Sequence, residues 1–154
     1  MPVMSLVSPD PVQSLVSGFS AEPVPAVRDT ILLVEDDAPV AMLLTHILAR
    51  TDRRVLRARD GAECRHLFEQ QSASVALVFM DCGLPDIHGG SLCRQLRAVV
   101  PGLPMLLTSG RAQPGLVALL EPDGPTAFIS KPYLPAEVLR HVRTLLGVSA
   151  GNNG

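Results

Sequence analysis

The stretch Val75-Ala76-Leu77-Val78-Phe79-Met80-Asp81 decides the fold of this chain. Its first six residues are all apolar, and such an uninterrupted run predicts a strand that is buried on both faces. Strands of this kind occur in parallel sheets that carry helices on either side. An acidic residue directly follows the run, so the predicted strand ends at a carboxylate.

Short apolar runs and longer amphipathic segments alternate on either side of this strand. They predict a doubly wound, five-stranded parallel sheet between two layers of helices, a three-layer α/β fold. The predicted strands are residues 31–34, 54–58, 75–80, 104–107 and 125–129. The predicted helices begin near residues 39, 62, 90 and 135, and a weaker one follows residue 110.

Two of these helices carry specific expectations. The first has an apolar set at helical spacing, which predicts that one face packs on the sheet. The set is Val40, Leu43, Leu44, Ile47 and Leu48. The fourth contains Pro114 and Gly115, which lower helix propensity, so we expect a weakened helix there.

The length of 154 residues, with 47% apolar content, favours one domain. We assign that domain to residues 29–148. Residues 1–28 are rich in Pro, Ser and Val, which predicts a mobile extension, and residues 149–154 are interpreted as a frayed tail.

Composition narrows the function classes. A net charge of -2 argues against a nucleic-acid partner, because such domains usually carry a clustered basic excess. The three cysteines form no CxxC pair and suggest neither disulfides nor a zinc site. No apolar run approaches the roughly 20 residues that a membrane helix needs, and no signal peptide is evident. A cytoplasmic location without a membrane partner is expected.

Polar residues stand at the ends of four predicted strands, where ligands of such sheets bind. The carboxylates of Glu35, Asp36 and Asp81 would repel one another unless a cation shared the site, and oxygen ligands favour Mg²⁺. Thr108 and Lys131, the only lysine of the chain, complete the set. Three carboxylates, one Mg²⁺ and one ammonium balance to zero formal charge. Taken alone, Glu35-Asp36-Asp37 is also typical of a solvated helix start.

Five motifs in this order resemble the receiver domain of bacterial two-component response regulators. They are Leu33-Val34-Glu35-Asp36-Asp37, Phe79-Met80-Asp81, Leu84-Pro85 with Gly89, Leu107-Thr108-Ser109 and Lys131-Pro132. The resemblance covers roughly residues 30–147 and is specific as a joint pattern. It implies the flavodoxin-like (βα)5 receiver fold.

The resemblance also implies roles for individual residues. Asp81 would accept a phosphoryl group from a phosphohistidine, and the phosphoryl oxygens would be bound by Thr108 and Lys131. Mg²⁺ would be bound by Glu35 (through water), Asp36, Asp81 and the backbone carbonyl of Gly83. Thr108 and Phe128 would form the conformational switch, and the Lys131–Pro132 peptide bond would be cis.

The implied partners are a sensor or hybrid histidine kinase, or a phosphotransfer protein, and a downstream protein target. A homodimer is compatible with this reading. The resemblance implies a signalling module and not an enzyme. One alternative is a receiver-like binding module that is never phosphorylated. Another is a phosphatase of the haloacid dehalogenase type, but Gly83 stands where that class places its second acid.

Overall fold

The computed structural model describes residues 27–147, and these form a five-stranded parallel sheet in the order β2-β1-β3-β4-β5. The strands are β1 (Thr30–Val34), β2 (Arg54–Ala58), β3 (Val75–Asp81), β4 (Met105–Ser109) and β5 (Thr126–Ser130). The helices are α2 (Ala38–Leu48), α3 (Gly61–Gln71), α4 (Gly89–Val99), α5 (Leu116–Leu120) and α6 (Pro135–Leu145). Short 3-10 turns follow three of them, η2 (Ala49–Thr51), η3 (Ser72–Ser74) and η4 (Glu121–Asp123). The predicted α/β class and parallel five-stranded sheet are confirmed.

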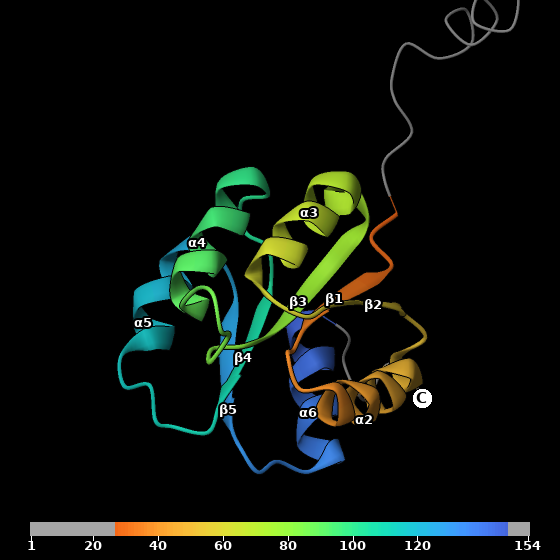
Figure 1. Ribbon diagram of the computed structural model, residues 1–154. Helices are drawn as coiled ribbons and strands as arrows, with labels where there is room; N and C mark the ends of the chain where they lie inside the picture. The colour runs from red at the N-terminus through yellow and green to blue at the C-terminus, as the bar shows by residue number, and fades with distance from the viewer. Residues whose placement is uncertain (1–26, 148–154) are drawn as a thin grey trace, which may run out of the picture.

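Helices cover both faces of the sheet, which makes three layers (Figure 1). Alternate residues of each strand point to opposite faces, and the two faces bury separate apolar clusters. Leu32 and Val34 of β1 pack with α3, α4 and α5, whereas Ile31 and Leu33 pack with α2 and α6. All seven residues of β3 are buried, as expected for a central parallel strand.

Side chains at the helix starts fix where the chain turns away from the sheet. Asp37 caps α2 by accepting a hydrogen bond from the amide of Val40, and Pro39 occupies the first turn of that helix. Asp60 caps α3 in the same way through the amide of Glu63. These caps fix where the loops that follow β1 and β2 end and the next helices begin.

The predicted apolar face of α2 is wrong at one position. Leu43 is 57% exposed and Met42 is 69% exposed, while Ala41 and Leu44 are buried. On a helix of about 3.6 residues per turn, Ala41, Leu44 and Leu48 form one stripe, and Leu43 lies outside its edge. The apolar set predicted for α2 therefore contains one residue more than the helix can pack against the sheet.

The fourth helix of the predicted series is formed, and it is short. α5 spans five residues and is continued by the 3-10 turn η4. Gly115 precedes it with a φ of 81°, a left-handed conformation that glycine adopts readily. The helix is short, as expected, but the predicted placement of Pro114 and Gly115 inside it is wrong, because both residues precede its first turn.

The predicted extension falls mainly on residues 1–26 and the predicted tail on residues 149–154, which lie outside the described residues. Arg28 is described, and its guanidinium donates hydrogen bonds to the carbonyls of Ser72 and Val75. Within residues 27–147, no helix is both long and apolar enough to span a membrane.

Candidate functional site

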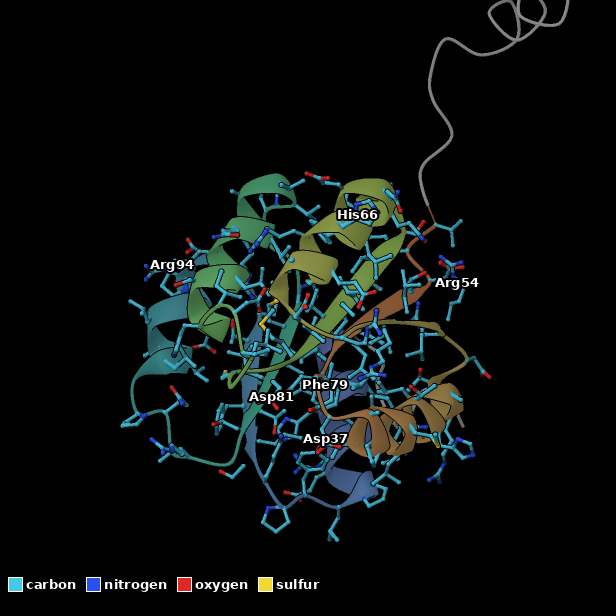
Figure 2. The ribbon with its side chains drawn as sticks, viewed as in Figure 1. Asp37, Arg54, His66, Phe79, Asp81 and Arg94 are labelled. Atoms are coloured by element: carbon cyan, nitrogen blue, oxygen red, sulfur yellow. The ribbon has the colours of Figure 1, made fainter. Side chains whose placement is uncertain are left out.

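The carboxyl ends of four neighbouring strands meet at one edge of the sheet. Asp81 pairs in register with Thr108, and Val34, which precedes Glu35, pairs with Met80. β5 adjoins β4 with Ser130 opposite Ser109, which brings the segment after β5 to the same edge. Figure 2 shows Asp81 at the end of β3 and Asp37 at the start of α2, both on this side of the molecule.

Three carboxylates converge at this edge. One oxygen from each of Glu35, Asp36 and Asp81 lies within 4.8 Å of the other two. Glu35 and Asp81 are buried, and Asp36 is exposed. Burial, together with the nearby charge of Asp81, raises the pKa of Glu35 to about 7, although the hydrogen bond from the Asp37 amide opposes this shift. Ionisation of all three carboxylates is therefore unfavourable unless a positive charge lies near them.

Lys131 supplies a positive charge to the cluster. Its Nζ donates a hydrogen bond of 2.8 Å to Oδ2 of Asp81 and lies 3.8 Å from Oε1 of Glu35. Burial lowers the pKa of Lys131, but the hydrogen bond to Asp81 and the charges of both acids raise it above its ordinary value. The Lys131–Pro132 peptide bond is cis, which is the isomer that the resemblance implies.

Two buried oxygens at the site have no hydrogen-bond partner among the described residues. They are Oε1 of Glu35 and Oγ1 of Thr108. A buried polar atom without a partner loses its hydration without compensation, and this costs about 1–3 kcal/mol. Both atoms are therefore positioned to bind something that the protein itself does not supply.

The backbone around Asp81 leaves the site open. The amide of Gly83 donates a hydrogen bond of 2.8 Å to Oδ1 of Asp81, which orients the carboxylate. A Cβ at position 83 would lie 3.5 Å from that oxygen, and one at position 110 would meet nothing within 4 Å. Neither Gly83 nor Gly110 therefore places a side chain over the carboxylate.

Asp37 and Phe128 lie beside the cluster and have other contacts. The Asp37 side chain caps α2, so the helix-start interpretation of Glu35-Asp36-Asp37 is confirmed for this residue. Phe128 is half-buried on β5 opposite Leu107, and it packs against the apolar cluster beneath α5. Its neighbour Ile129 pairs with Thr108 and packs on the other face of the sheet, with α2 and α6.

Sequence reasoning missed Tyr133, two residues after Lys131. Its ring is half-buried and packs against Phe79, with ring centroids 6.4 Å apart. Burial raises the pKa of Tyr133 to about 12, and the charges of Lys131, Glu35 and Asp81 are close enough to affect it. The signal that could have found it is the position of an aromatic residue directly after a strand-end Lys-Pro pair.

The residues present fit a hard divalent cation. Glu35, Asp36 and Asp81 offer only oxygen ligands, and one buried oxygen of Glu35 accepts no hydrogen bond from the described residues. Oxygen ligands that include one or two carboxylates, with room for water, are the usual environment of Mg²⁺. The arrangement thus combines a cluster of three carboxylates with an ammonium group and a hydroxyl group.

A comparison with protein families agrees with this geometry. Residues 31–143 match the model of the response regulator receiver domain family. The chain is 36% identical over 119 residues to the transcriptional regulatory protein CreB of Escherichia coli, a match that covers 77% of this chain and 51% of CreB. It spans about half the length of CreB and of several other curated relatives.

Solved structures give the same result. The receiver domain of a signal transduction histidine kinase from Syntrophus aciditrophicus has 30% identity and a TM-score of 0.66, covering 77% of this chain and 90% of that one. The receiver domain of a sensor histidine kinase from Pseudomonas aeruginosa has 27% identity and a TM-score of 0.65, covering 77% and 98%. The latter structure holds a magnesium ion coordinated in its active-site cleft.

Proposed function

The chain belongs to the response regulator receiver family of two-component signalling, and from this membership we propose that Asp81 is the residue that accepts the phosphoryl group. The observation that carries the proposal is the convergence of Glu35, Asp36 and Asp81 around one point, with Lys131 bonded to Asp81. Oε1 of Glu35 and Oγ1 of Thr108 add support, because both are buried at this site and neither has a hydrogen-bond partner among the described residues.

The chemistry proposed for Asp81 is nucleophilic attack on the phosphorus of a phosphohistidine. A bond forms between a carboxylate oxygen and phosphorus, the bond from phosphorus to the imidazole nitrogen breaks, and its electron pair returns to that nitrogen. An acyl phosphate remains on Asp81. Such transfers depend mainly on positioning and charge stabilisation.

The residues around Asp81 meet these two needs. The Gly83 amide holds Oδ1 of Asp81, and the Lys131 ammonium, already beside Oδ2, can bind a phosphoryl oxygen after transfer. The Thr108 hydroxyl, which has no partner among the described residues, can donate to another phosphoryl oxygen.

We further propose that Mg²⁺ binds at Glu35, Asp36, Asp81 and the Gly83 carbonyl. When bound, the ion would offset the negative charge of the carboxylates and the phosphoryl group. Glu35 must then be ionised, which its raised pKa makes less favourable without the ion.

The proposed output is a conformational change read by another protein. Movement of Thr108 toward the phosphoryl group would be transmitted across the β4–β5 pairing to Phe128, which packs on the face of the sheet that α5 covers. The proposed phosphodonor is a histidine kinase or a phosphotransfer protein, and the proposed receiver of the signal is a downstream protein or a second copy of the chain.

Intact mass measurement tests the acceptor. The protein incubated with acetyl phosphate and Mg²⁺ should gain one phosphoryl group, and the Asp81→Asn variant should gain none. Asp37→Asn is the matched control: it removes a neighbouring charge, but asparagine caps a helix as well as aspartate does, so labelling should persist. Labelling of Asp81→Asn, or the absence of an adduct in the unmodified protein, would contradict the proposal.

A further inference from the structure

A groove of about 500 Å³ lies between η2 and α6, and none of the carboxylates of the strand-end site lines it. Three arginines line it: Arg50 from η2, and Arg140 and Arg143 from α6. In the described part of the chain, none of the three guanidinium groups makes a hydrogen bond or an ion pair, and no acidic residue lines the groove. Three guanidinium groups without a counter-charge favour an anionic ligand.

The rest of the groove is apolar or small. Leu139 is buried at its floor, and Pro135 and Ala136 form the end toward the start of α6. A matching ligand therefore carries one or two carboxylates together with compact apolar side chains. An extended peptide segment has this character, whereas a small inorganic anion would leave the apolar part uncovered.

The groove begins close to the point where the N-terminal segment joins the domain. A second hollow, of about 360 Å³, is lined by Arg28 and Arg53 together with Leu145 and Leu146. Arg28 therefore lies beside the C-terminal end of α6, and Thr144, the next residue back along that helix, already lines the groove. α2 and α6 are neighbours on this face of the sheet (Figure 1).

The sequence of residues 1–26 complements the groove in charge. It contains two acidic residues, Asp10 and Glu22, and no lysine, arginine or histidine. Glu22 is followed by Pro23-Val24-Pro25, which are compact and apolar. At about 3.3 Å per residue, the six steps along the chain from Glu22 to Arg28 can span about 20 Å. Arg140 lies only about 6 Å along α6 from Thr144, at about 1.5 Å per residue.

We propose that the segment Glu22-Pro23-Val24-Pro25 docks in this groove of its own chain. The Glu22 carboxylate pairs with Arg140 and Arg143, and Val24 with its flanking prolines packs on the exposed apolar part of the groove. Because the segment is tethered next to the groove, its effective concentration is high and a modest intrinsic affinity suffices. An acidic partner of the α6 face would have to displace it.

Paramagnetic relaxation in the full chain tests the docking. A spin label is attached to a cysteine introduced by Ser20→Cys. The native thiols stay unlabelled near pH 7 because they are buried, and burial raises the pKa of Cys64 to about 12 and that of Cys82 to about 11. Amide signals of residues 139–144 should lose at least about twofold more intensity than those of residues 100–102, which border the hollow that Arg28 also lines.

Arginine variants provide the controls. Arg140→Gln/Arg143→Gln should abolish the difference between the two regions, and Glu22→Gln should reduce it. Arg65→Gln/Arg94→Gln changes the net charge equally on the opposite face of the sheet, where Figure 2 shows Arg94 on α4, and should leave the difference intact. Equal signal loss in both regions, or a difference unchanged by Arg140→Gln/Arg143→Gln, would overturn the proposal. Signal loss in unlabelled chains mixed with labelled ones would assign the groove to a second copy instead.

Discussion

Arg97 and Glu35 are both buried ionisable residues of this domain, and they differ in how their polar atoms are paired. Arg97, 5% exposed, donates hydrogen bonds to the carbonyls of Leu103, Leu120 and Pro125 and to Oγ1 of Thr126, at 2.7–2.9 Å. Glu35, 1% exposed, has one oxygen without a hydrogen-bond partner.

The difference separates a structural polar centre from a ligand-binding one. Arg97 ties α4 to the carbonyl that ends α5 and to the start of β5, so its guanidinium is part of the scaffold. Burial lowers the pKa of Arg97, and the surrounding carbonyls compensate the buried charge. At the strand ends the compensation is incomplete, and the missing partners correspond to the cation and phosphoryl group that we propose.

The largest expected change in stability comes from removing the hydrogen bonds of the Arg97 guanidinium. Arg97→Met should lower the free energy of unfolding by about 3 kcal/mol, because several buried carbonyls lose their donor at once. Urea unfolding measures the change. Arg94→Met, an exposed position on the same helix, should change the stability by less than about 0.5 kcal/mol. A loss as small as in this control would mean that water replaces the guanidinium.

A smaller change in the free energy of unfolding, of opposite sign, is expected at the strand-end site. Thr108→Val keeps the side-chain shape and removes a buried hydroxyl that has no partner, so it should raise the free energy of unfolding by about 1 kcal/mol. Thr126→Val is the matched control, since the Thr126 hydroxyl is bonded to Arg97 and to the Gly124 carbonyl and its loss should destabilise. Destabilisation by Thr108→Val in the same unfolding experiment would show that its hydroxyl is paired.

A third effect is a pH dependence of the stability. Without Mg²⁺, the folded chain holds a proton on Glu35 up to about pH 7, above the ordinary pKa of 4.5, so between these values folding binds protons and stability falls as pH rises. Burial lowers the pKa of His141, which gives a slope of opposite sign and offsets part of the Glu35 contribution. The difference between the unmodified protein and Glu35→Gln isolates the Glu35 contribution.

Unfolding curves from pH 5 to 7 measure this difference. The unmodified protein should lose stability relative to Glu35→Gln as pH rises, and Mg²⁺ should reduce that loss because it favours the ionised carboxylate. A difference that does not change with pH would mean that Glu35 is already ionised at pH 5.

Much of the fold was predictable because its signals are local in sequence. The apolar run of β3, the alternation with amphipathic helices and the weakening of α5 by Pro114 and Gly115 all lie within short windows. The acids at strand ends were also readable, because parallel strands bring their carboxyl ends to one edge. The residue roles at that edge remain proposals that rest on this convergence.

The sequence by itself determined the class of fold, the order of the motifs and the chemical types gathered at the strand ends. Tertiary structure alone decided that Leu43 faces outward, that Asp37 caps a helix beside the carboxylate cluster, and that Arg97 is buried among carbonyls from three segments. The physical reason is that exposure and hydrogen-bond pairing depend on neighbours distant in sequence, which no local pattern specifies.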